Sequence, residues 1–292
     1  MSKIEWTDQS WNPVTGCTKI SPGCKNCYAE RFAIRMFGAI YGKTAEGKPR
    51  PFAEVRCHPE RLEQPLHWKK PRMVFVNSMS DLFHEDVPFR FVDEVVVHAS
   101  MARQHVFQIL TKRPQRAAHY ANLCAQLAVV RRSTPLWPQP NIWLGVSVED
   151  QETADERIPL LLQTPAAVRF VSVEPMLGPV NLAPFLIDRW LTKSPIGTDP
   201  RGPGYRRNPQ DYECAIDWVI CGGESGPGAR SFDFRWAESL LQQCRQADVA
   251  FFMKQIGGKP YGLPLVRDRK GADPSEWPIG LRVREFPQAK AS

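Results

Sequence analysis

The feature that most restricts how this chain can fold is the alternation of short apolar runs with longer amphipathic stretches. The apolar runs predict β-strands at residues 73–76, 106–110, 142–146, 168–173, 216–221 and 250–253. Between them, apolar residues recur at helical spacing, as in the segments that follow Pro88 and Pro114. Short buried strands separated by amphipathic helices indicate a parallel sheet with helices on its outer face.

The expected fold class is therefore α/β, a TIM-barrel-like assembly of parallel strand–helix units that is either partial or full. The chain has 292 residues, enough for one such barrel, which we place at residues 1–258. A Gly-, Pro- and Arg-rich loop insertion at about 188–215 would act as a mobile insertion or lid, and residues 259–292 would form an irregular C-terminal extension. A doubly wound open sheet is the main rival, because strand spacing alone does not determine whether the sheet closes.

Polar or charged residues follow each predicted strand. In a parallel barrel the carboxyl ends of the strands share one rim, and ligand sites lie there. Any one of these residues could equally cap a helix or form a surface charge, so their joint position carries the argument. The rim residues are Asn77, Ser78, Asp81, Thr111, Lys112, Ser147, Glu149, Glu174, Glu224 and Lys254.

Three cysteines, Cys17, Cys24 and Cys27, lie within eleven residues with the spacing C-x6-C-x2-C. Glycine and proline residues beside and between them let the backbone bend, so the three sulfurs can converge on one centre. Thiolates bind soft metals, and structural zinc takes four protein ligands. Three thiolates would leave one position open for a substrate or cofactor.

Two other interpretations of this loop stay open. The cysteines could be small buried hydrophobic residues, or three ligands of a structural zinc completed by Cys57, His58 or another distant residue. Disulfides are the weakest option, because eight cysteines without a secretory leader indicate a reducing, cytoplasmic compartment. No apolar run is long enough to cross a membrane, so no membrane partner is expected.

The net charge of +7 hints at a polyanionic partner, although a solvated basic surface explains it about as well. Lys112, Arg113 and Lys254, together with arginines at 201–207, could form a basic rim at the barrel mouth. The candidate substrate-binding residues are Thr111, Lys112, Arg113 and Lys254.

The glycine-rich stretch from Gly222 to Gly228 follows a predicted strand directly. Glycines there would let the backbone approach a ligand and expose its N–H groups. The stretch matches neither the phosphate-binding loop nor the dinucleotide fingerprint. Its carboxylate, Glu224, would suit a cationic amine.

Several motifs in combination resemble the phage and prophage three-cysteine-motif proteins, a family of unknown function described as radical SAM-like. The motifs are WNPVTGC…PGCKNCYAE, SVEPMLG and CGGESGPGAR, and the resemblance covers residues 4–258. It implies a [4Fe–4S] cluster held by Cys17, Cys24 and Cys27, with S-adenosylmethionine bound to the fourth iron through its amino and carboxylate groups. It also implies an external electron donor and a 5′-deoxyadenosyl radical that abstracts a hydrogen from the substrate.

The chain departs from the usual radical SAM pattern at three points. Six residues separate the first two cysteines instead of three, and Asn26 replaces the aromatic residue that normally precedes the last cysteine. After the second strand, Asn77 to Asp81 stands where a Gly-Gly-Glu segment is usual. The candidate cofactor-binding residues are Tyr28, Asn77, Ser78, Asp81, Ser147, Glu149, Glu174, Gly222, Gly223 and Glu224.

The leading hypothesis is therefore a radical SAM-type enzyme, with a nucleic acid or nucleotide as its candidate substrate. The alternative is a non-catalytic, zinc-stabilised nucleic-acid-binding protein, and a third option is a degenerate barrel that binds a partner. Iron and sulfide content separates the first from the second.

Overall fold

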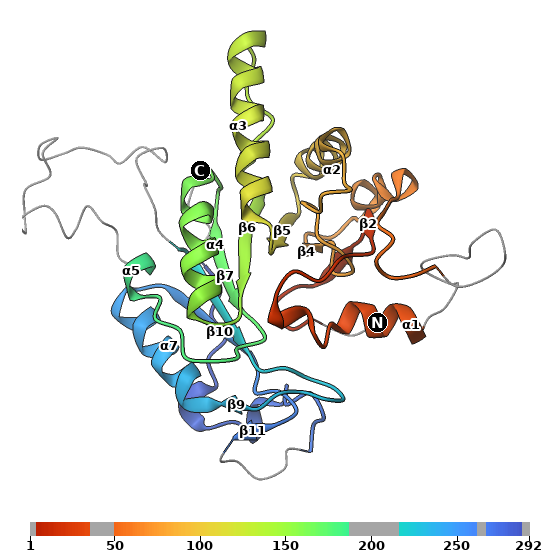
Figure 1. Ribbon diagram of the computed structural model, residues 1–292. Helices are drawn as coiled ribbons and strands as arrows, with labels where there is room; N and C mark the ends of the chain where they lie inside the picture. Colours follow the sequence, from red (N-terminus) through yellow and green to blue (C-terminus); the bar gives the residue numbers. More distant parts are fainter. Residues whose placement is uncertain (1–3, 36–49, 187–215, 262–266, 288–292) are drawn as a thin grey trace, which may run out of the picture.

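The computed structural model describes residues 4–35, 50–186, 216–261 and 267–287 (Figure 1). Within these residues, seven strands form one parallel sheet, and no strand pair joins its two edges. Because the strands follow one another in chain order, the sheet winds in one direction only, and the doubly wound alternative is wrong. The fold is an open half-barrel. The strand order is β1 (Gln9–Trp11), β4 (Met73–Val76), β5 (Val106–Thr111), β6 (Ile142–Val148), β7 (Arg169–Val173), β8 (Trp218–Gly222) and β10 (Ala250–Gln255).

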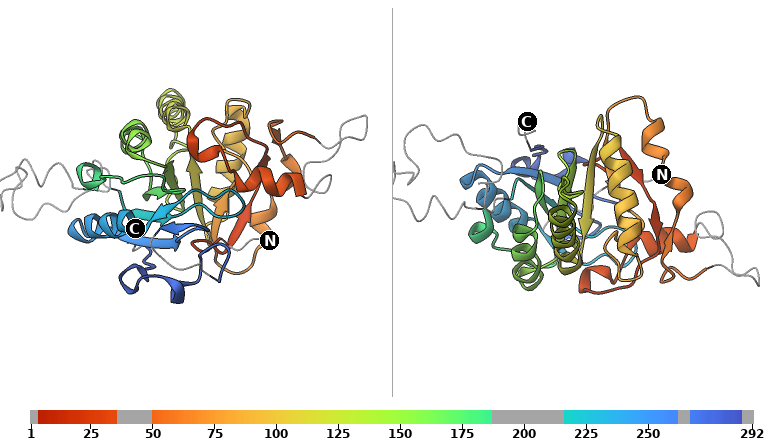
Figure 2. Two further views of the ribbon diagram at one scale, coloured as in Figure 1. Left: turned by 60° about the horizontal axis from the view of Figure 1, so that its bottom comes forward. Right: turned by 90° about the horizontal axis from the view of Figure 1, so that it is seen from above.

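Helices cover the outer, convex face of the curved sheet (Figure 2). Asp233 is the N-cap of the helix before β10, and its carboxylate accepts a hydrogen bond from the backbone N–H of Arg235. Asp150 caps α4 in the same way, because its carboxylate accepts a hydrogen bond from the backbone N–H of Thr153. The helices are α1 (Tyr28–Arg35), α2 (Phe89–Met101), α3 (Pro114–Arg131), α4 (Gln151–Gln163), α5 (Ala183–Leu186) and α7 (Phe234–Gln246).

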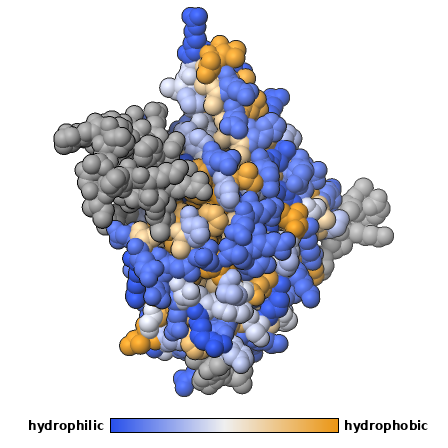
Figure 3. All heavy atoms as spheres, turned by 60° about the vertical axis from the view of Figure 1, so that its left-hand side comes forward, coloured by the Kyte–Doolittle hydropathy of each residue, from blue (hydrophilic) through white to orange (hydrophobic). Residues whose placement is uncertain are grey.

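Short elements complete the described chain. The pairs β2 (Val14–Thr15) with β3 (Arg56–Cys57), and β9 (Phe232–Asp233) with β11 (Pro260–Tyr261), form two small sheets. The 3-10 helices are η1 (Pro22–Cys24), η2 (Pro59–Arg61), η3 (Gln64–His67), η5 (Pro274–Glu276) and η6 (Ile279–Leu281). The end of α3 projects beyond the body of the molecule, and exposed apolar side chains, Val129 and Val130 among them, lie near its tip beside hydrophilic ones (Figure 3).

Alternate side chains of each strand face the helices and the interior of the half-barrel. The main core lies between the helices and the sheet. The amino-terminal half of the interior is filled by aromatic rings: Trp6, Phe75, Trp143, Phe170, Trp218 and Phe252. Trp6 precedes β1 and closes this floor, since its ring centroid lies 4.7 Å from that of Phe75 and 6.1 Å from that of Trp218. The carboxyl-terminal half is left for polar groups.

The C-terminal extension, which was expected to be irregular, pairs with the outer edge of β10. The backbone N–H of Met253 donates to the carbonyl of Val283 at 2.8 Å, and the N–H of Glu285 donates to that of Phe251 at 2.9 Å. The extension thereby covers the outer edge of β10, which would otherwise expose unpaired backbone groups. The expected insertion at 188–215 lies outside the described residues. No helix in the described ranges is long and apolar enough to span a bilayer.

Candidate functional site

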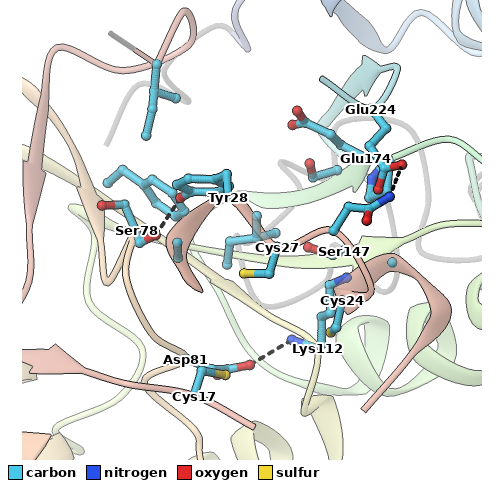
Figure 4. A pocket seen from close by; sticks show the side chains of 18 of the residues that line it. Cys17, Cys24, Cys27, Tyr28, Ser78, Asp81, Lys112, Ser147, Glu174 and Glu224 are labelled. Atoms are coloured by element: carbon cyan, nitrogen blue, oxygen red, sulfur yellow. Dashed lines mark hydrogen bonds between the residues drawn. The ribbon is translucent and has the colours of Figure 1, made fainter. Parts of the chain in front are cut away.

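A cavity of about 310 Å³ lies at the carboxyl end of the strands. All three cysteines of the loop from Cys17 to Cys27, the cysteine loop, contribute to its wall. Figure 4 shows their side chains entering from different points, with Cys17 beside Asp81 and Cys24 beside Lys112. The other expected site residues that line it are Tyr28, Asn77, Ser78, Asp81, Thr111, Lys112, Arg113, Ser147, Glu174, Gly223, Glu224 and Lys254. Two expected residues, Glu149 and Gly222, are not part of the wall.

The cysteine thiols differ in their electrostatic surroundings. Burial raises the pKa of Cys17 to about 12, and the nearby Asp81 carboxylate acts in the same direction. Burial also opposes ionisation at Cys24, but the Lys112 ammonium and hydrogen bonds from Ser21 and nearby backbone outweigh it, so the pKa of Cys24 is lowered. A metal would displace the proton from either thiol, because cysteine binds metals as the thiolate.

The turn after β4 holds Asp81 in a dense network. Its carboxylate accepts hydrogen bonds from the Thr111 hydroxyl at 2.8 Å and the Lys112 N–H at 3.0 Å. The Arg113 guanidinium lies 3.4 Å from the same carboxylate and also donates to the Thr18 hydroxyl at 2.9 Å. The nitrogen that faces Asp81, Nη1, also lies 3.7 Å from the sulfur of Cys17.

Glu149 follows β6 and is fully buried, with none of its surface exposed. Its carboxylate forms ion pairs with Lys112 and with Arg157, the latter at 3.1 Å. It also accepts a hydrogen bond from the Ser21 hydroxyl at 2.9 Å. A buried carboxylate needs such partners, because an unpaired buried charge is costly.

Glu224 lines the cavity at the end of β8, but its carboxylate already has protein partners. Arg230 donates to it from Nη2 at 2.6 Å and from Nε and the backbone N–H at 2.9 Å each. Asn26 of the cysteine loop donates to it at 2.9 Å. Burial raises the pKa of Glu224, but the hydrogen bonds from Arg230 and Asn26 outweigh this and hold it below its usual range.

Glu174 pairs with Lys254 at 2.5 Å, an ion pair that spans β8 from the ends of its two neighbouring strands. Gly222 lies beside this pair, and a Cβ there would make only an ordinary contact, 3.5 Å, with the Glu174 carboxyl carbon. At Gly223 a Cβ would lie 2.6 Å from the carbonyl oxygen of Ile256. Close packing between strand ends therefore accounts for the second glycine, where the sequence suggested approach to a ligand.

The expected basic rim is charge-balanced in the structure. The described lining residues include four cations, Lys112, Arg113, Lys254 and Lys270, and four carboxylates, Glu5, Asp81, Glu174 and Glu224. The first three cations form ion pairs with carboxylates. The arginines at 201–207 lie outside the described residues.

The fourth zinc ligand considered from the sequence is engaged elsewhere. His58 shares hydrogen bonds with Thr15 at 2.7 Å and Glu60 at 2.9 Å, and Cys57 lies in β3. Neither residue lines the cavity. The described parts of the chain hold no group of three His, Cys, Asp or Glu side chains placed to bind one metal ion.

Sequence reasoning missed several residues of the site. Ser172 precedes Glu174 by two positions and so shares its face of β7, a signal that strand alternation could have given. Its register partner on β6 is Ser147, and neither hydroxyl has a hydrogen-bond partner among the described residues. No sequence pattern pointed to Arg157 or Arg230 as part of the site. Each arginine meets its carboxylate, Glu149 or Glu224, only in the folded chain.

The fold and site define an open α/β half-barrel with a cysteine-lined cavity at the carboxyl end of its strands. A family model described as "Protein of unknown function (DUF5131)" matches residues 1–276, and the chain belongs to this family. The description names no function and no source.

Comparison with curated proteins found no match. Among solved structures, the chain is similar to a variant of spore photoproduct lyase, with 11% sequence identity and a TM-score of 0.42. The match covers 83% of this chain and 62% of the other chain.

Proposed function

We propose that this protein is a radical SAM-type enzyme that holds a [4Fe–4S] cluster on Cys17, Cys24 and Cys27 and binds S-adenosylmethionine beside it. The observation that carries the proposal is the convergence of three thiols from one short loop on one cavity at the carboxyl end of a parallel half-barrel. The described residues that line this cavity include no fourth cysteine and no histidine. Three thiolates would therefore leave one iron free to bind a cofactor.

A cluster and a single zinc ion make different demands on the three thiols. Zinc needs four ligands at one point, whereas in a four-iron cluster each thiolate binds a different iron atom. The two residues considered as a fourth zinc ligand, Cys57 and His58, do not line the cavity that the three thiols share. The cluster therefore needs no protein ligand beyond the three cysteines, and metal analysis decides between the two.

The cluster would supply the electron that cleaves S-adenosylmethionine, and the chain's own residues would bind and orient that cofactor. Ser147 and Ser172 offer hydroxyls that bond to no other described residue, and Glu174 and Lys254 offer opposite charges within the same wall. These four polar groups suit a cofactor that carries both an amine and a carboxylate. Tyr28, Asn77 and Ser78 contribute further polar groups to the wall.

For the substrate we propose a nucleic acid or nucleotide, with the reducing electron drawn from an external donor. The net charge of +7 supports this choice, and Lys270 lies on the cavity wall without an ion-pair partner in the described chain. The opposing observation is the charge balance of the wall, which suits a small zwitterion equally.

Anaerobic reconstitution with iron and sulfide, followed by dithionite and S-adenosylmethionine, tests the proposal. We expect about four iron atoms per chain, a brown chromophore, and release of methionine and 5′-deoxyadenosine detected by mass spectrometry. A colourless protein that carries stoichiometric zinc would favour the non-catalytic alternative.

Single substitution of a cluster ligand sharpens this test. Cys24→Ala should abolish iron–sulfur absorbance, because a three-thiolate site cannot lose a ligand and keep the cluster. Cys57→Ala is the matched control, since Cys57 lies in β3 and does not line the cavity. Normal iron content in the Cys24→Ala protein would overturn the assignment.

A further inference from the structure

We propose that Asp81, Glu149 and Glu224 are positioning residues that fix the cysteine loop before any metal binds, and that they do not bind the cofactor. Each residue follows a different strand, and each supports a loop residue next to one cysteine: Asp81 supports Thr18 through Arg113, Glu149 packs against Gly23, and Glu224 accepts a hydrogen bond from Asn26. The proposal deepens the proposed function, because it assumes only that the cysteine loop is the metal-binding loop.

The first contact fixes the start of the loop. Asp81 orients Arg113 by an ion pair at 3.4 Å, and Glu85 accepts from the Nε of Arg113 at 3.0 Å. The guanidinium then donates to the hydroxyl of Thr18, the residue directly after Cys17, at 2.9 Å. Asp81 thus acts on the loop through Arg113. Because Asp81 and Arg113 are buried, this contact is shielded from water.

The second contact fixes the middle of the loop. The buried Glu149 carboxylate accepts the Ser21 hydroxyl and packs directly against Gly23, the residue before Cys24. A Cβ at Gly23 would lie 2.4 Å from Oε1 of Glu149, so any larger residue would push the loop off its support. Ser21 and Gly23 both lie in the six-residue segment between Cys17 and Cys24. The contact with Glu149 therefore gives this long segment a structural role.

The third contact fixes the end of the loop. Glu224 accepts from the side chain of Asn26, the residue before Cys27, and Arg230 donates to the Pro22 carbonyl at 2.9 Å. Asn26 also donates to the carbonyl of Gly228 at 2.9 Å. Asn26 stands where an aromatic residue is usual, and its amide makes hydrogen bonds that an aromatic ring cannot make.

The oxygen atoms of these carboxylates already have partners within the protein, so few positions are left for a ligand. Glu224 already accepts four hydrogen bonds, three of them from Arg230. Hydrogen bonds to a charged group are stronger than those between neutral groups, so a cofactor amine would have to displace a strong network. Glu174 differs, because its only ion pair in the described part of the chain is with Lys254, which does not belong to the cysteine loop.

Hydrogen–deuterium exchange of the metal-free protein tests the proposal with Glu224→Gln and Glu149→Gln. Each change keeps the side-chain shape and removes the charge that the cations pair with. We expect amides of residues 18–27 to exchange at least tenfold faster than in the wild type, while β4 to β8 keep their protection. Glu174→Gln is the matched control, a carboxylate of the same cavity with no contact to the loop, and should leave loop exchange unchanged.

Three outcomes would overturn the proposal. The first is wild-type loop exchange in both variants, and the second is a loss of protection spread evenly over the sheet, which would mark the pairs as general scaffold. The third is unchanged loop exchange together with weaker S-adenosylmethionine binding in cluster-loaded Glu224→Gln, which would make Glu224 a cofactor ligand. If Glu224→Gln does not fold, Arg230→Lys tests the same pair, since it keeps the charge and loses the bidentate geometry.

The exchange measurement needs no cluster. A protein that never binds iron can therefore still confirm or refute the positioning of the loop, and failure of the proposed function would show separately in the reconstitution experiment.

Discussion

At the scale of single residues, the site is a set of charges whose partners decide their role. Glu224 and Glu174 both line the cavity at strand ends, but one is held by Arg230 and Asn26 and the other by Lys254. A carboxylate with several charged donors is a rigid part of the protein. One with a single cation partner can exchange that partner for a ligand.

The depressed pKa of Glu224 makes its contribution to stability depend on pH. A carboxylate whose folded pKa lies below its unfolded value, about 4.3, stabilises the fold above that value and loses this effect as the pH falls through the folded pKa. Glu224→Gln should therefore lower the free energy of unfolding by about 1–3 kcal/mol at pH 7. The difference from the wild type should shrink below about pH 4.

Urea unfolding at pH 7, 5, 4 and 3 would measure this difference. A gap that stays constant down to pH 3 would show that the charge of Glu224 does not contribute.

At the scale of secondary-structure elements, the ends of β8 and β10 approach so closely that Gly223 is required. A Cβ on Gly223 would meet the Ile256 carbonyl at 2.6 Å, whereas the nearest atoms to a Cβ on Gly222 lie at 3.5 Å, an ordinary contact. The two adjacent glycines therefore differ: packing requires a glycine at position 223 but not at position 222.

Gly223→Ala should destabilise the protein by about 1–3 kcal/mol, because backbone at the end of β10 must move to admit the methyl group. Gly222→Ala, its neighbour and control, should change the free energy of unfolding by less than about 0.5 kcal/mol. Chemical denaturation of both variants in parallel tests this prediction. Equal costs at the two positions would contradict the packing explanation.

At the scale of the whole molecule, a ring from the N-terminal segment closes the floor of an open half-barrel. Trp6 is 2% exposed and packs against Phe75, Phe170 and Trp218, which come from three strands. Its contacts tie the first described residues to the middle and the end of the sheet.

Trp6→Ala should therefore cost about 3–5 kcal/mol, the usual range for removing a large buried ring. Trp6→Phe keeps an aromatic ring and removes an indole N–H that has no hydrogen-bond partner, so its cost should be clearly smaller. Urea unfolding monitored by circular dichroism gives both values. If Trp6→Ala unfolds like the wild type, the floor is held by the strands alone.

The net charge of the molecule bears on the proposed substrate. If phosphate contacts contribute to binding, affinity for a single-stranded oligonucleotide should fall about tenfold or more between 50 and 200 mM salt, through counterion release. Fluorescence anisotropy measures this, with the unphosphorylated nucleoside as a control for base recognition. Salt-insensitive or undetectable binding would favour a small neutral or zwitterionic substrate.

Much of the fold could be predicted from the sequence for a physical reason. Strands buried on both faces need near-continuous apolar runs, so residues 73–76 and 106–110 identify two strands without reference to any partner. The convergence of strand-end residues on one cavity followed from the parallel direction of the strands. The sequence did not predict that the sheet stays open between β1 and β10. Closure of a barrel depends on how far the twisted sheet curls, and the spacing of strands along the chain does not determine this.

The sequence was enough to predict the alternating strand–helix units, the loop of three cysteines and the polar residues at the strand ends. The order of the strands in the sheet, and which of these polar groups is available to a ligand, depended on contacts between distant segments. Glu149 sits directly after its strand as predicted, yet it is buried against Arg157 and the cysteine loop. Ion pairs form between groups within a few ångströms of each other in space, and the chain brings Arg157, Arg230 and Asn26 to their carboxylates only when the sheet and its loops have packed together.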